Sequence, residues 1–133
     1  MTTNKPRVSG QPLSPYEHFV LGAEFLIRAK LPLPVPFRDA LNGTPRPMAL
    51  TTADDLPIWM RGQGYNAPQR AVLTRALGAL AISAFYLRCI VEGTPRVTLN
   101  GEHVGTVTAA EAEFTAATLI GFPGKFALQY DDE

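Results

Sequence analysis

The residues that could bind a metal ion are few and far apart in this sequence. Its two histidines, His18 and His103, belong to different segments, and Cys89 is its one cysteine. No C-x-x-C or H-E-x-x-H spacing brings such ligands together, although structural zinc sites normally need four of them. We therefore predict no metal site and expect both histidines to be structural or solvated.

Covalent or acid–base catalysis has equally little support. Cys89 lies in an apolar stretch, where a thiol ordinarily behaves as a small buried hydrophobe. The adjacent carboxylates of Asp54 and Asp55 stand where a helix should begin, and acidic groups at that position usually complement the helix dipole. No glycine-rich phosphate-binding loop of the Walker or G-x-G-x-x-G type is present. The sequence thus predicts no catalytic residue and no cofactor, and it disfavours an enzyme.

The arginines are the remaining candidate functional groups, because they could bind the phosphates of a nucleic acid. The chain has 12 basic and 12 acidic residues, and this balance argues against a strongly electrostatic nucleic-acid binder. The last three residues are all acidic, however, so the rest of the chain has a net charge of +3. Six arginines lie between Arg46 and Arg96, which leaves room for a local basic face.

Size and cysteine usage predict one soluble, cytoplasmic domain. A chain of 133 residues suits a single domain, and a lone cysteine fits a reducing compartment. Residues 1–10 have no apolar core of the kind found in a signal peptide, and the longest apolar run, Ala76 to Leu87, falls short of the roughly 20 residues that span a bilayer. We expect a flexible arm over 1–13, a domain over 14–121, and a C-terminal extension with an acidic tail over 122–133.

In the first half of the chain, capping and proline signals define the elements. Ser14-Pro-Tyr-Glu17 is a capping box with proline at the first helical position, and it predicts a helix to about residue 30. The alternating prolines of residues 31–37 predict an extended path without a helix. A short strand over 48–51 and a helix from Thr52 to the glycines at 62 and 64 should follow.

In the second half, the periodicity changes from helix to hairpin. Asn66 is a candidate cap for a helix with an apolar stripe from Val72 to Leu80, and Ser83 is a candidate cap for a helix over 84–91. Asn100-Gly101 between two β-rich runs predicts a hairpin over 95–107. Thr108-Ala-Ala-Glu111 is a further capping box, which should start a helix that stops at Gly121, and residues 126–130 have a short β-like pattern. The predicted fold is α+β: a mainly helical single domain with about five helices and one or two short β-hairpins.

The segment from residue 67 to 107 contains an ordered series of motifs, which read Leu73-Thr-Arg-Ala-Leu77, Ser83-Ala-Phe-Tyr-Leu87, Gly93-Thr-Pro-Arg-Val-Thr-Leu-Asn-Gly101 and Gly105-Thr-Val107. This series resembles the ProQ/FinO domain of bacterial RNA chaperones. The resemblance is carried by an ordered series of motifs rather than by any one of them. Upstream, residues 33–37 stand where the family has a Phe-Pro-x-x-Phe motif, and residues 46–48 stand where it has Arg-Pro-Leu. The likeness extends over about residues 15–118.

This resemblance implies binding of structured RNA, notably terminator-like stem-loops with a 3′ single-stranded tail. The backbone N–H groups of the helix that starts near Ser83 could receive a phosphate. Tyr86 and Arg96 match the family's tyrosine and arginine, which could stack on a terminal nucleotide and fork onto phosphate. Arg70 falls near a basic position of the family, and the other candidate contacts are Arg46, Arg75 and Arg88.

The sequence also departs from the family pattern at several basic positions. Ala49 stands where the family commonly has a lysine, and Thr74 where it commonly has an arginine, although Arg75 is adjacent. Each lost phosphate contact lowers affinity and flattens its salt dependence. Each candidate also has a structural interpretation, with Tyr86 as a core tyrosine and the arginines as solvated charges. The alternative function is therefore a degenerate domain of this type that serves as a protein–protein interaction module.

Overall fold

The first helix begins where the capping box predicts. The computed structural model describes residues 12–120, and in it α1 (Pro15–Arg28) starts after Ser14, whose side chain accepts from the N–H of Glu17 while the Glu17 carboxylate accepts from that of Ser14. The predicted extension of this helix to residue 30 is slightly too long, because Lys30 adopts a left-handed φ of 61°. Most of the expected N-terminal arm and the whole C-terminal extension lie outside the described residues.

The prediction of an extended path over residues 31–37 is wrong for its second half. Helix α2 (Val35–Leu41) forms there, with Pro34 at the N-cap and Pro36 in the first turn. First-turn residues have no hydrogen-bond acceptor within their own helix, so a proline there costs little. Phe37 is fully buried and meets Phe19 of α1 edge to face, with the ring centroids 4.8 Å apart. Burial of this ring anchors the short helix in the core.

The predicted strand over 48–51 is also wrong. Met48 forms an isolated parallel bridge with Val97, and α3 (Thr52–Gly62) begins four residues later. In this bridge the N–H of Val97 donates to the Pro47 carbonyl, and the N–H of Ala49 donates to the Val97 carbonyl, both at 2.9 Å. The early start of α3 leaves room for this one bridge and not for a ladder.

The two central helices follow their predicted caps. Helix α4 (Ala67–Ala81) starts with a reciprocal capping box between Asn66 and Gln69. Helix α5 (Ala84–Leu87) starts after Ser83 as expected but ends before Val91. The N–H groups of residues 89 and 90 bond three residues back rather than four, which tightens the chain into a turn and ends the helix.

The Asn-Gly hairpin is confirmed, and it leads into the last described helix. Strands β1 (Pro95–Val97) and β2 (His103–Thr106) pair antiparallel, and Gly101 in the turn has a left-handed φ of 87°. Helix α6 (Ala109–Ile120) follows the predicted Thr108–Glu111 capping box. The fold class is confirmed as mainly helical α+β, with six helices among the described residues because α2 adds one to those expected.

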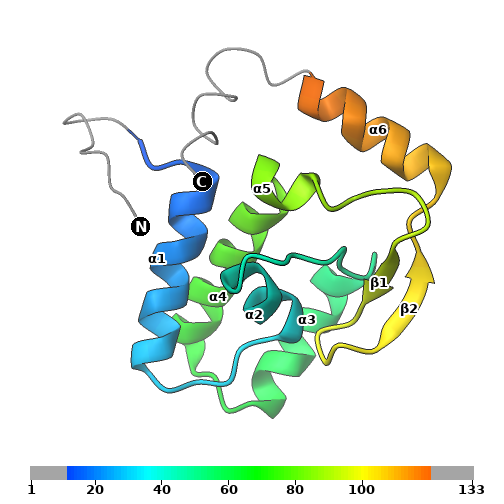
Figure 1. Cartoon of the computed structure of the whole chain (residues 1–133). Helices are drawn as coiled ribbons and strands as arrows, with labels where there is room; N and C mark the ends of the chain where they lie inside the picture. The colour runs from blue at the N-terminus through cyan, green and yellow to red at the C-terminus, as the bar shows by residue number, and fades with distance from the viewer. Residues whose placement is uncertain (1–11, 121–133) are drawn as a thin grey trace.

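The core is built on the contact between α1 and α4. Figure 1 shows these helices together on one side of the molecule, with the hairpin on the other and α6 at the periphery. A Cβ added at Gly22 of α1 would lie 2.6 Å from the Cβ of Ala76 in α4, so this close approach requires glycine. The largest fully buried apolar side chains are Phe19, Leu26, Phe37, Leu73 and Leu80.

Candidate functional site

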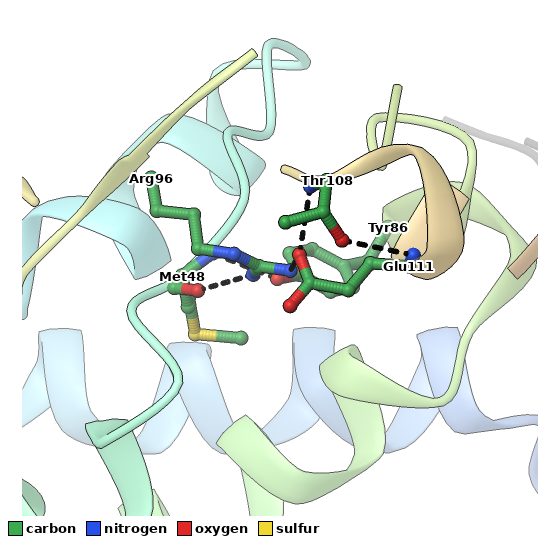
Figure 2. A network of polar contacts seen from close by, with 5 residues as sticks. All are labelled: Met48, Tyr86, Arg96, Thr108 and Glu111. Carbon is green, nitrogen blue, oxygen red and sulfur yellow. Dashed lines mark hydrogen bonds and ion pairs between the residues drawn. The ribbon is translucent and has the colours of Figure 1, made fainter. Parts of the chain in front are cut away.

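Two residues predicted to form a site, Tyr86 and Arg96, meet at the backbone of Met48 (Figure 2). The Tyr86 hydroxyl oxygen accepts from the N–H of Met48 at 2.8 Å, and the Nη1 group of Arg96 donates to the Met48 carbonyl at 2.7 Å. The bridge to Val97 uses the atoms of residues 47 and 49, so Met48 presents its own polar atoms to the other side. On that side, the Tyr86 and Arg96 side chains make the two hydrogen bonds that the backbone of a neighbouring strand would otherwise make.

Both of these side chains are buried. Tyr86 is 6% exposed, and burial raises the pKa of its phenol to about 12. Arg96 is 7% exposed, and its Nη2 group donates to Glu111 Oε1 at 3.0 Å. Within residues 12–120, the buried Nε of Arg96 makes no hydrogen bond. Arg96 therefore uses its Nη1 and Nη2 groups to hold the fold, whereas its buried Nε donor has no acceptor within the described residues.

Glu111 links this network to the start of α6 (Figure 2). Its Oε1 accepts from the backbone N–H of Thr108 at 3.0 Å as well as from Arg96, and its own N–H donates to Thr108 Oγ1 at 3.1 Å. The Thr108 hydrogen bond, followed by the Arg96 side chain, lowers the pKa of this carboxyl below its usual value. The capping pattern identified Glu111 in the sequence, but nothing local indicated its contact with Arg96, or the role of Met48.

Ser83 is joined to the same network through the backbone of Tyr86. It is fully buried, its hydroxyl accepts from the N–H of Tyr86 at 3.2 Å, and it donates to the Leu80 carbonyl at 2.7 Å. The serine therefore fixes the angle between α4 and α5 and, through it, the position of the Tyr86 ring.

Arg70 and Arg75 lie together at a second place, an open hollow of about 440 Å³ between α3 and α4. Arg70 is half-buried and donates from Nη1 to the Tyr65 carbonyl at 2.9 Å, whereas Arg75 is exposed. The hollow is otherwise lined by uncharged residues, namely Pro57, Met60, Ala71 and Thr74.

The two remaining candidates lie at the edges of this arrangement. Arg46 is paired through Nε with Asp39 at 2.8 Å, two residues before Met48. Arg88 is exposed at the C-terminal end of α5. The structure thus groups Ser83, Tyr86 and Arg96 in one network and Arg70 with Arg75 in one hollow.

Metal-binding side chains do not cluster in the described part of the chain. His18 and His103 are both exposed, and residues 12–120 contain no group of three or more side chains able to hold a metal ion. Cys89 is partly buried against the core, and burial raises the pKa of its thiol to about 12. No helix within these residues is both long and apolar enough to cross a membrane.

Together these features define a small, mainly helical α+β domain in which a short helix is tied to a β-hairpin through one buried backbone segment. A model of the ProQ/FINO family matches residues 29–126, so the chain belongs to the ProQ/FinO family, and the resemblance found in the sequence is confirmed. This family comprises non-enzymatic RNA-binding proteins and RNA chaperones of bacterial small-RNA regulation. Comparison with curated proteins gives no match to this chain.

Proposed function

We propose that this chain is an RNA chaperone whose domain, residues 14–121, binds stem-loops with a 3′ single-stranded tail. Its ligands would be small RNAs and the 3′ ends of messenger RNAs in the cytoplasm. It would stabilise the bound hairpin or assist strand pairing, without a chemical step and without a cofactor. Membership of the ProQ/FinO family supports the RNA-binding part of this proposal.

The observation that carries the proposal is the environment of Arg96. A guanidinium carries five N–H donors in a planar fork that matches the oxygens of phosphate. The Arg96 side chain is 9% exposed, it is held in place by Met48, and within the described residues its Nε has no acceptor. A buried donor without a partner is costly, so a group in this state is a candidate for ligand binding. An RNA phosphate provides the missing acceptor.

The hollow between α3 and α4 supplies the second basic contact. Arg70 and Arg75 both line it, and no acidic side chain is among its lining residues. Arg75 is exposed, so its fork can reach an RNA backbone without breaking a contact within the core. Arg46 and Arg88 would add weaker contacts at the edge of the bound RNA.

Binding to a terminator-type hairpin with a 3′ U-tail tests the proposal. Fluorescence anisotropy at two salt concentrations would compare the wild type with Arg75→Ala, and Arg28→Ala would be the control because it removes an equal charge from the exposed end of α1. We expect Arg75→Ala to weaken binding more than Arg28→Ala and to reduce the salt slope by about 0.7–0.9. An RNA with a blocked 3′ tail should bind more weakly than the intact RNA.

A folded wild-type protein that binds no hairpin at low salt would overturn the proposal. Equal losses in the two arginine variants would instead remove Arg75 from the site. Circular dichroism of each variant would confirm that the fold is retained before affinities are compared.

One observation favours protein–protein interaction as the second candidate function. Helix α6 exposes large apolar side chains, with Phe114 at 74% and Ile120 at 81%. Exposed apolar surface of this kind is typical of interaction sites. Sedimentation velocity over a range of concentrations would detect self-association through this helix. Its loss in a Phe114→Ser variant, together with an absence of RNA binding, would favour this function over the first.

A further inference from the structure

The Glu111 carboxylate does more than cap α6. Residues 12–120 contain two other reciprocal capping boxes, Ser14 with Glu17 and Asn66 with Gln69. The second of these shows that a neutral amide oxygen is sufficient for the cap. The negative charge of Glu111 is therefore not needed at the start of α6, and it is placed 3.0 Å from the Nη2 group of Arg96.

The contact between these residues uses only part of the arginine fork. The Nε and Nη2 groups share one edge of a planar guanidinium, and an oxyanion with two available oxygens can accept from both. Glu111 accepts from Nη2 through Oε1, and the same oxygen also serves the Thr108 cap. Nε is left without an acceptor among the described residues. This edge is thus half used, and a phosphate could use it fully.

This edge of the guanidinium faces Glu111, which is the more exposed of its two neighbours. The side chain of Glu111 is 31% exposed, compared with 9% for Arg96, and Met48 on the opposite side of the guanidinium is buried. Helix α6, which carries Glu111, buries only Thr115 among its residues. An element with so few buried contacts can shift at low cost.

We propose that Glu111 is an acidic latch on Arg96, which occupies the position of an RNA phosphate and must be displaced when RNA binds. This inference rests on the proposed RNA-binding function. The latch satisfies the Nη2 group of the arginine when no RNA is bound, and it lowers the affinity for RNAs that offer only a single weak phosphate contact. On displacement, the start of α6 loses the carboxylate that accepts from Thr108, so RNA binding and the anchoring of α6 are coupled.

A charge-matched pair of variants tests the latch. Glu111→Gln keeps a cap acceptor, as Gln69 does in α4, but it removes the charge that faces Arg96. Glu113→Gln removes the same charge from an exposed position two residues further along α6. With the U-tailed hairpin in fluorescence anisotropy, we expect Glu111→Gln to bind about three- to tenfold tighter than the wild type. Glu113→Gln should change affinity by less than about twofold, as expected for a screened surface charge.

A double variant shows whether the tighter RNA binding of Glu111→Gln depends on Arg96. The double variant Glu111→Gln, Arg96→Met should bind the hairpin no more tightly than Arg96→Met alone, because the two residues act on one contact. If Arg96→Met does not fold, the Nε–H resonance of Arg96 in ¹⁵N-labelled wild-type protein provides the same information, and it should shift on addition of RNA. An Nε–H signal unmoved at saturating RNA would overturn the latch.

The outcomes separate the latch from the function on which it rests. Hairpin binding by the wild type, with equal affinities for Glu111→Gln and Glu113→Gln, would overturn the latch and leave the RNA-binding function standing. Absence of binding by the wild type and by Glu111→Gln alike would overturn both. Hairpin binding by Glu111→Gln but not by the wild type would support the latch and would mean that Glu111 blocks the site in the wild type.

Discussion

Tyr86 and Arg96 hold the two polar backbone atoms of one residue, Met48, the tyrosine as acceptor at 2.8 Å and the arginine as donor at 2.7 Å. The short helix α5 and strand β1 are joined through this single peptide segment. Because neither residue is more than 7% exposed, both contribute to the stability of the domain whatever else they bind.

Replacement of Tyr86 by phenylalanine should destabilise the domain. It leaves the buried N–H of Met48 without an acceptor, and an orphaned buried donor costs about 1–3 kcal/mol. Urea unfolding measures this loss. Tyr65→Phe is the matched control, since the Tyr65 hydroxyl donates to the Pro32 carbonyl and its removal should cost less. Equal unfolding midpoints for wild type and Tyr86→Phe would contradict the network as a source of stability.

Two glycine-to-alanine substitutions should have opposite effects on stability. At Gly22 the new methyl group would meet the Cβ of Ala76 at 2.6 Å, and overpacking of this kind typically costs about 1–3 kcal/mol. At Gly78 in α4 a Cβ meets nothing within 4 Å, so alanine should stabilise the helix by roughly 0.5–1 kcal/mol. Thermal unfolding of both variants measures the pair. A more stable Gly22→Ala variant would show that α1 and α4 are less tightly packed than described.

The Cys89 thiol should react slowly in the native protein. Burial raises its pKa to about 12, so at neutral pH almost none of it is the nucleophilic thiolate. Alkylation by iodoacetamide at pH 8, followed by mass spectrometry, should be many times slower in buffer than in concentrated urea. Similar rates under the two conditions would place the thiol at the surface.

The contribution of Glu111 to stability should depend on pH in the acid range. Its carboxyl has a pKa below the usual 4.5 in the folded protein, so the stabilisation it provides is present above that value. It is lost as the pH falls through the lowered folded-state pKa. The difference in free energy of unfolding between wild type and Glu111→Gln should therefore shrink as the pH is lowered from 5. A difference that stays constant over this range would mean that the carboxylate has no favourable partner in the fold. Glu113→Gln, measured alongside, reports any general effect of charge.

Much of the secondary structure could be predicted because its signals are local. The helix caps at residues 14, 66 and 108 and the Asn-Gly turn each involve contacts within about four residues, and each is found as expected. The proline-rich segment misled the prediction, because alternating prolines are also compatible with the N-cap and first turn of a helix. Burial of Phe37 against α1 favours that second arrangement, and residues 31–37 alone do not reveal it.

The sequence by itself determined the fold class, the caps and the likeness to the ProQ/FinO family, since these depend on residue types in a fixed order. Only the tertiary structure decided how Tyr86 and Arg96 are used. Their hydrogen bonds to Met48 join residues 38 and 48 positions apart, and such contacts form only once helices and hairpin have packed. The same holds for the Glu111 carboxylate, which looks like an ordinary capping residue until the hairpin brings Arg96 within 3.0 Å of it.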